Sequence, residues 1–224
     1  MKLYFHPAST TSRAIMLFAA DNRIALDFEV IDLLSGEHLQ PAFTAINPNG
    51  QVPVLEDGDF RLAESSAILK YLADTIHSPA YPSDIRLRAR VNERMDWFNT
   101  SLSRELCYGL IYPQFLPKHR KPDAYVQAQS LAWSRPLAVR CLDILDSDLI
   151  GTNAYVCGER ISIADYLGIA MLTLGETIRI DYSAWRNISR WIARMKDRPT
   201  WPAANEAFYT YLVQPLEKVS FLTL

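Results

Sequence analysis

A run of four hydroxyl side chains, Ser9 to Ser12, could donate hydrogen bonds to an anion. The run follows an apolar strand pattern at 2–5 and opens a helical pattern at 13–22. A strand that leads into a helix presents unpaired N–H groups and the positive end of the helix dipole. If the anion is a thiolate, one O–H donor and this helix end could lower a thiol pKa of ~8.5 by ~2 units, which takes ~2.7 kcal/mol. The alternative is that the hydroxyls only cap the helix.

A proline inside an apolar segment marks a second candidate contact. Residues 47–55 read Asn-Pro-Asn-Gly-Gln-Val-Pro-Val-Leu, so Pro53 stands where a sheet would need an N–H donor. Such a proline indicates either an edge strand or a cis peptide bond that turns the backbone of Val52 outward. The N–H and C=O groups of Val52 could then pair with an extended peptide.

The residues before the next helical pattern suit the head group of an α-amino acid. Ser65 would offer a hydroxyl and backbone N–H groups at a helix N-terminus, which favours a carboxylate. Glu64 beside it could pair with an ammonium group. Helix capping is again the alternative explanation.

Aromatic residues recur at helical spacing between 97 and 115. Tyr108, Tyr112 and Phe115 lie towards the end of this stretch and could line an apolar pocket for a second substrate. Arg104 could add a polar group to the pocket, although a solvated helix face explains it equally well.

A second serine-led helix start has only a structural interpretation. Ser162 and Asp165 have the spacing of a capping box, with Asp in place of the preferred Glu. The pattern predicts the start of a buried helix, and we assign it no catalytic role.

The elements that must position these residues change in character along the chain. Residues 1–78 read as strand, helix, strand, an irregular segment, then a hairpin turning at Gly58 and a helix. Two prolines indicate a linker at 79–86, and residues 87–224 show helical patterns only. We therefore expect an α/β plus all-α protein, with a thioredoxin-like βαβ-ββα domain followed by a helical bundle that binds the second substrate.

Composition argues against several other classes of protein. The formal net charge is −2, and neither part of the chain is basic enough for a nucleic-acid surface. No apolar run reaches the ~20 residues of a membrane span. The N-terminus lacks a signal-peptide pattern, so a cytoplasmic protein is expected. Three cysteines and four scattered histidines have no metal-ligand spacing, so we expect free thiols and no metal.

Five motifs in order make the sequence resemble the cytosolic glutathione transferase family over essentially the whole chain. They lie at Pro7–Ala14, Gly36–Leu39, Asn47–Pro53, Leu62–Leu72 and Ser162–Asp165. The first looks most like the serine-type theta and delta classes and their bacterial relatives. The resemblance implies glutathione as co-substrate, with the thioredoxin-like domain binding it.

The resemblance also implies individual roles. It assigns stabilisation of the thiolate to Ser9, with Thr10 as the rival because some bacterial relatives carry a cysteine there. A tyrosine-type mechanism is opposed, since Tyr4 falls inside the first strand. The implied glutathione contacts are His38 and Gln51 for the glycine end, Val52 beside a cis Pro53 for the cysteinyl backbone, and Glu64 and Ser65 for the γ-glutamyl group.

The sequence departs from the delta-class pattern at two positions. Gly50 and Ser66 stand where those relatives carry a basic residue and an arginine. Binding of the glycine end would therefore rest on His38 and Gln51.

The leading prediction is a homodimeric glutathione S-transferase in which the thiolate attacks a hydrophobic electrophile. The resemblance implies dehalogenation among its reactions and detoxification as its role. The alternative is a non-catalytic, transferase-like binding or regulatory module. The presence of Ser9, Val52-Pro53 and Glu64-Ser65 argues against it, because such relatives often lose these residues. Thiol–disulfide exchange is opposed by the absence of a cysteine near the first turn.

Overall fold

The N-terminal third folds around a four-stranded sheet, and the computed structural model describes the whole chain, residues 1–224. The strand order is β2-β1-β3-β4. β2 pairs parallel to β1, whereas β3 pairs antiparallel to both β1 and β4. The strands are β1 (Lys2–Phe5), β2 (Asp27–Val30), β3 (Val54–Asp57) and β4 (Phe60–Ala63).

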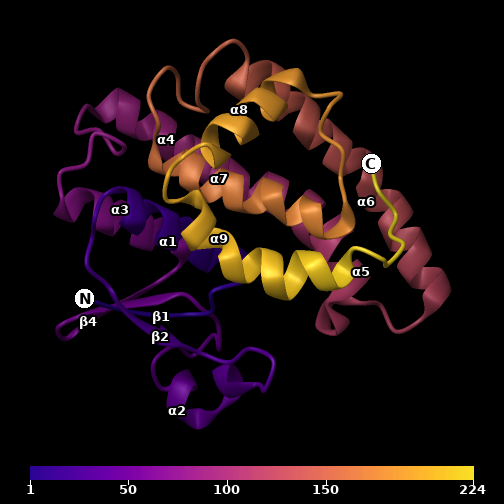
Figure 1. The fold of residues 1–224 in the computed structure, drawn as a ribbon, viewed down its shortest axis with the longest axis horizontal. Coiled ribbons are helices and arrows are strands. Elements are labelled where there is room, and N and C mark those ends of the chain that lie inside the picture. Colours follow the sequence, from indigo (N-terminus) through magenta and orange to yellow (C-terminus); the bar gives the residue numbers. More distant parts are fainter.

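Alternation along β1 divides the core of this domain between the two faces of the sheet. Leu3 and Phe5 belong to the main core, with α1 (Thr10–Asp21) and α3 (Ser65–Thr75). Tyr4 points the other way and packs with Phe43 of the short α2 (Pro41–Thr44). Accordingly, α1 and α3 lie between the sheet and the other helices, and α2 lies on the far side (Figure 1).

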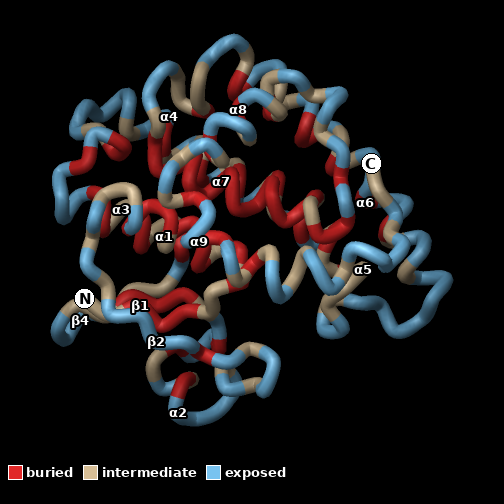
Figure 2. Tube along the Cα trace, viewed as in Figure 1, coloured by how far each residue is buried: buried red, intermediate tan, exposed pale blue.

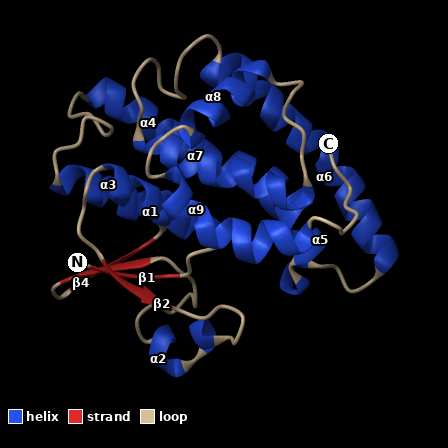
Figure 3. Ribbon diagram, in the orientation of Figure 1, coloured by secondary structure: helices blue, strands red, loops and turns tan.

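The remainder of the chain is helical, as Figure 3 shows by the confinement of the strands to one end. α4 continues through a π-helical stretch, Phe98–Ile111, directly into α5. Every residue of α7 is buried, so this helix forms the centre of the bundle (Figure 2). The helices are α4 (Ile85–Trp97), α5 (Tyr112–Phe115), α6 (Ala124–Ile144), α7 (Ile163–Thr173), α8 (Arg186–Lys196) and α9 (Trp201–Phe208).

The predicted fold class, a thioredoxin-like domain followed by an all-helical one, is confirmed. α3 ends at Thr75 and α4 begins at Ile85, while the domain limits of 1–78, 79–86 and 87–224 stay predictions. No helix in the chain combines the length and the apolarity needed to cross a membrane.

The capping box at the start of α7 is confirmed as a structural feature. One carboxylate oxygen of Asp165 accepts from the backbone N–H and the hydroxyl of Ser162, both at 2.8 Å. The other accepts from the Val156 N–H and from the indole N–H of Trp191, both at 2.9 Å. Burial raises the pKa of this carboxyl, and the four hydrogen bonds act in the opposite direction. The box therefore joins α7, α8 and the loop before α7.

Candidate functional site

Strand register brings three of the predicted segments together at one end of the strands, which is called the sheet edge below. Antiparallel pairing sets Tyr4 of β1 opposite Val54, where β3 begins, and sets Val54 opposite Ala63, where β4 ends. At this edge the chain leaves β1 for α1, enters β3 from the 47–53 turn, and leaves β4 for α3. The helix starts at Ser9 and Ser65 therefore lie on the same side of the sheet as the Val52–Pro53 peptide.

Ser9 is the N-cap of α1, as the capping alternative requires. Its hydroxyl oxygen accepts a long bond, 3.4 Å, from the N–H of Ser12 and lies 3.2 Å from the hydroxyl of Thr11. Thr11 donates in turn to the carbonyl of Val52 at 3.4 Å. A serine that accepts a capping bond keeps its own O–H proton, so capping and donation to a ligand are compatible. The first turn of α1 carries no acidic residue, so no carboxylate of its own neutralises the positive end of the helix.

The other two hydroxyls of the turn have different surroundings. Thr10 is buried, and its hydroxyl is 2.8 Å from the phenol of Tyr112 at the start of α5. The hydroxyl of Ser12 is fully buried and makes no hydrogen bond. Ser9 is thus the half-buried serine of the turn, while Thr10 is engaged with the helical domain.

The Val52–Pro53 peptide bond is cis. The preceding turn is held by Asn47, whose side-chain amide donates to the carbonyl of Gln51 at 2.7 Å and whose oxygen accepts from the N–H of Asn49 at 3.1 Å. Buried Asn47 therefore determines how the exposed Gln51 and the Val52 backbone are presented.

The loop that carries His38 packs directly on this turn. Gly50 has φ +57°, and a Cβ atom there would lie 3.0 Å from the carbonyl oxygen of His38. A basic residue at position 50, as in the delta-class pattern, would need both a strained backbone and a shift of this loop. The Nδ1 atom of His38 is buried without a hydrogen-bond partner.

The start of α3 also lacks an acidic residue in its first turn. Ser65 is its first residue and is buried, while Glu64 before it is exposed and has a positive φ of 66°. A left-handed backbone at a glutamate is uncommon and occurs where the surroundings require it. The arrangement offers N–H groups to a carboxylate, with a free carboxylate beside them.

Three of the predicted pocket residues form one aromatic cluster. The ring centroid of Tyr112 lies 5.0 Å from that of Tyr108 and 6.1 Å from that of Phe115. Burial raises the pKa of the Tyr108 phenol, and the charge of Glu64 adds to this effect. The bond between Tyr112 and Thr10 joins the cluster to the start of α1. Its third ring neighbour, His119, was not predicted.

Two arginines have opposite environments. Arg104, predicted as a polar group of the pocket, is exposed and pairs with neighbouring Glu105 at 2.6 Å. Arg13, which the sequence analysis missed, is 1% exposed and donates to the side chain of Asn205 at 2.7 Å and to the carbonyl of Ala170 at 2.8 Å. Burial lowers the pKa of Arg13 to about 10. One turn beyond Ser9, it ties α1 to α7 and α9.

Two family descriptions match the chain at these places. Residues 1–74 match the N-terminal domain of glutathione S-transferase, and residues 111–199 match its C-terminal domain. The chain belongs to the glutathione S-transferase family. The first match contains the whole sheet and the candidate glutathione-binding residues, and the second contains the central helix of the bundle.

Relatives of this transferase include theta-class members. It is 36% identical over 178 residues to human glutathione S-transferase theta-1, covering 77% of this chain and 72% of that one. It is 37% identical over 174 residues to the theta-1 enzyme of Bos taurus, with the same coverage.

Solved structures agree with this assignment. A delta-class glutathione transferase of Nilaparvata lugens superposes with a TM-score of 0.81 at 30% identity, covering 96% of this chain and 98% of that chain. Human glutathione transferase theta-2, in complex with glutathione and an unknown ligand, gives 0.81 at 27% identity, covering 100% and 93%.

Proposed function

We propose that this glutathione transferase activates the thiol of glutathione with the hydroxyl of Ser9. The observation that carries the proposal is the start of α1, where a half-buried serine caps a helix whose first turn contains no carboxylate. A thiolate placed there receives an O–H hydrogen bond and the positive end of the helix dipole. Together these can supply the ~2.7 kcal/mol that a pKa lower by ~2 units requires.

Ser9 is preferred over Thr10 because of their partners. The Thr10 hydroxyl is buried and shares a 2.8 Å bond with Tyr112, so a ligand reaches it less readily than the half-buried Ser9. The Ser9 hydroxyl has only long contacts, 3.4 Å to the N–H of Ser12 and 3.2 Å to the hydroxyl of Thr11, so a bound thiolate can accept its proton in place of Thr11. Thr10 then acts as a support that holds the first turn against the acceptor wall.

The rest of glutathione would lie along the same edge. The γ-glutamyl carboxylate fits the start of α3 at Ser65, with its ammonium group beside Glu64. The cysteinyl backbone fits along Val52, next to the cis Pro53. The glycine carboxylate would meet the half-buried His38 and the exposed Gln51, whose loops pack together at Gly50.

The second substrate would be a hydrophobic electrophile held by Tyr108, Tyr112 and Phe115. These rings are joined to the catalytic turn through the bond between Tyr112 and Thr10. An apolar wall with few polar groups suits an alkyl or aryl halide or a similar small molecule. Arg104 would reach the pocket only by leaving its partner Glu105.

We also propose a homodimer formed through α3 and α4. Exposed large apolar side chains lie at the start of α4, where Ile85 is 80% exposed and Leu87 is 58% exposed. Others are Ile76, directly after α3, and Phe60 on β4. Covering them with a second copy removes apolar surface from water. Sedimentation velocity should give twice the mass of one chain, and Leu87→Glu should return the monomer.

Three free cysteines suit a cytoplasmic site of action.

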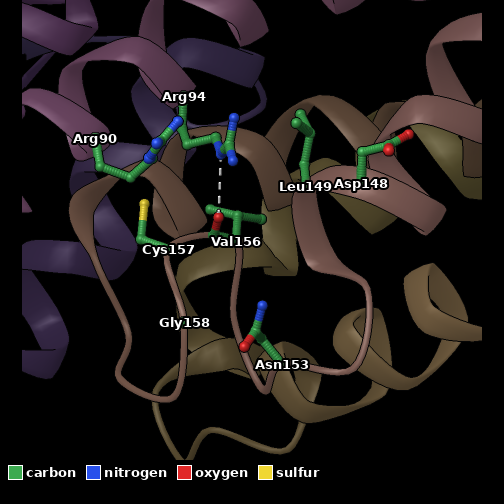
Figure 4. A pocket seen from close by; sticks show the side chains of 8 residues that line it. All are labelled: Arg90, Arg94, Asp148, Leu149, Asn153, Val156, Cys157 and Gly158. Atoms are coloured by element: carbon green, nitrogen blue, oxygen red, sulfur yellow. Dashed lines mark hydrogen bonds between the residues drawn. The ribbon is translucent and has the colours of Figure 1, made fainter.

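The experiment for Ser9 combines glutathione titration by calorimetry with thiolate absorbance. The protein's own thiols do not interfere, because burial raises the pKa of Cys107 to about 12 and of Cys157 to about 11. Cys157 lies beside Arg90 and Arg94 in a hollow of ≈ 300 Å³ away from the site (Figure 4). Wild type should develop a thiolate signal near neutral pH, and Ser9→Ala should need a pH higher by ~2 units.

Matched variants decide between the remaining hypotheses. Ser162→Ala removes an equivalent serine at a structural helix start and should leave the signal unchanged. If Ser9→Ala keeps the wild-type signal and Thr10→Val loses it, Thr10 is the thiolate donor instead. Tight binding of glutathione by wild type without any thiolate signal would establish the non-catalytic binding module.

A further inference from the structure

His119 is the one titratable side chain built into the aromatic cluster that lacks a role in the proposed function. It lies in a short helical turn, Pro117–His119, after α5. Its ring stacks on Tyr112 with centroids 5.4 Å apart and an interplanar angle of 26°. It meets Tyr108 edge-on at 5.2 Å and 83°. Two tyrosines therefore hold the half-buried imidazole on the acceptor side of the site.

The stack connects His119 to the catalytic turn. The phenol of Tyr112 is 2.8 Å from the hydroxyl of Thr10, which directly follows Ser9. Thus the ring that His119 covers is hydrogen-bonded to the residue next to the proposed thiolate donor. The ring nitrogens of His119 make no hydrogen bond within the chain, so both are available to a bound molecule.

The charges around His119 favour its neutral form. Burial and the positive charges of Lys118 and Lys121 lower its pKa below the ordinary value of 6.5. The groups that face it from the helix are the phenols of Tyr108 and Tyr112, whose own pKa values are raised, so they stay uncharged. The imidazolium is therefore a stronger acid than usual, and the neutral ring takes up this proton as the pH falls.

We propose that His119 donates the proton to electrophiles that acquire a negative oxygen when the thiolate attacks, such as epoxides. This inference rests on the proposed function of the site. The sulfur–carbon bond forms while the carbon–oxygen bond of the epoxide breaks, and the alkoxide takes the proton of the imidazolium. Neutral His119 then recovers a proton from water. Displacement of a halide needs no proton, since the anion leaves as it is.

The halide reaction is therefore an internal control for the epoxide reaction. With 1,2-epoxyhexane and 1-iodohexane as probes, the two acceptors have the same chain length and the same nucleophile. His119→Phe retains an aromatic ring for the stack on Tyr112 but carries no proton. It should lower kcat/KM for the epoxide by about 100-fold, within the usual range for general acid catalysis, and change the iodide value by less than about 3-fold.

Two further variants separate proton donation from packing. His119→Gln keeps an N–H donor that does not titrate, so it should recover part of the epoxide activity and abolish its pH dependence on the alkaline side. Lys118→Gln removes a neighbouring positive charge, which should raise the pKa of His119 and move the alkaline limb of the epoxide profile to higher pH. The iodide profile should stay level there in every variant.

The outcomes are decisive in each case. Three results would overturn the role of His119. The first is an equal loss of kcat/KM with both acceptors in His119→Phe. The others are an epoxide pH profile without an alkaline limb and a wild type that uses the iodide but not the epoxide. The thiolate absorbance of bound glutathione should be the same in wild type and in His119→Phe. Its absence from wild type would instead reject the proposed function of Ser9, so the two failures can be told apart.

Discussion

α1 and α7 both begin with a serine N-cap, yet their N-termini are completed in different ways. At α7, Asp165 in the first turn accepts four hydrogen bonds and is fully buried. At α1, the first turn carries no acidic residue, and the cap Ser9 makes one long bond of 3.4 Å to the backbone. The positive end of α7 is thus neutralised from within, whereas that of α1 is available to a ligand.

The difference shows how to separate a structural helix start from a binding one. Both starts satisfy the general preference for serine at an N-cap. A carboxylate from the same turn occupies the N–H groups and the dipole, as Asp165 does. Where that carboxylate is missing and the cap is reachable from outside, an anionic ligand can take its place.

Of the substitutions at the two helix starts, Asp165→Ala should have the largest effect on the free energy of unfolding. It leaves the N–H groups of Ser162, Val156 and Trp191 without their acceptor in a buried place, so the free energy of unfolding should fall by about 3–5 kcal/mol. Urea denaturation measures it. Asp148→Ala, at an exposed position, is the control and should stay within about 0.5 kcal/mol of wild type. A loss below 1 kcal/mol in Asp165→Ala would contradict the structural role of the box.

Ser9→Ala should show the reverse pattern, with a large effect on chemistry and a small one on stability. The rate constant kcat/KM at neutral pH should fall by about 100-fold, because ~2.7 kcal/mol of preferential thiolate stabilisation is lost. The free energy of unfolding should fall by no more than about 1 kcal/mol, since the capping bond is long. Steady-state kinetics and urea denaturation on the same preparation test both statements.

Ser162→Ala is the stability counterpart of Ser9→Ala. It removes the hydroxyl that donates to Asp165 at 2.8 Å, so the free energy of unfolding should fall by about 1–2 kcal/mol. The thiolate titration should not change. A shifted titration would mean that the two helix starts are coupled, which the comparison denies.

Thr10→Val should have an intermediate, mixed effect. Loss of the bond to Tyr112 leaves the phenol unpaired and should cost about 1 kcal/mol of stability. The kcat value should fall about 5-fold, because the aromatic residues that hold the second substrate lose their contact with the first turn of α1. The thiolate titration is the deciding measurement, because it should keep its wild-type midpoint.

Ser12→Ala should have the smallest effect. Its hydroxyl is buried and makes no hydrogen bond, so its removal should leave stability unchanged or raise it by up to about 1 kcal/mol. Thermal and urea unfolding measure the change. Destabilisation by more than 1 kcal/mol would show that the hydroxyl has a partner in solution.

Much of the fold could be predicted because its signals are local. The Asp-Gly turn predicted the β3–β4 hairpin, and the Ser162–Asp165 spacing predicted the start of α7. The contacts that complete the candidate site join distant residues. Thr11 meets Val52, and Thr10 meets Tyr112, across 41 and 102 positions of the chain. No periodicity or turn pattern reports such pairs, and Arg13 was missed for the same reason. The contacts of His119 with Tyr108 and Tyr112 are close in sequence, but they depend on how the turn after α5 packs back on the helix.

The sequence by itself determined that hydroxyl groups would stand at the start of α1, because strand, turn and helix are set by neighbouring residues. The tertiary structure alone decided which serine of the turn remains accessible. Packing of the helical domain engages Thr10 with Tyr112 and encloses Ser12, and it leaves Ser9 half-buried at the sheet edge. A hydroxyl donates to a ligand only when the ligand can reach it, and whether it is reachable depends on packing against residues distant in sequence.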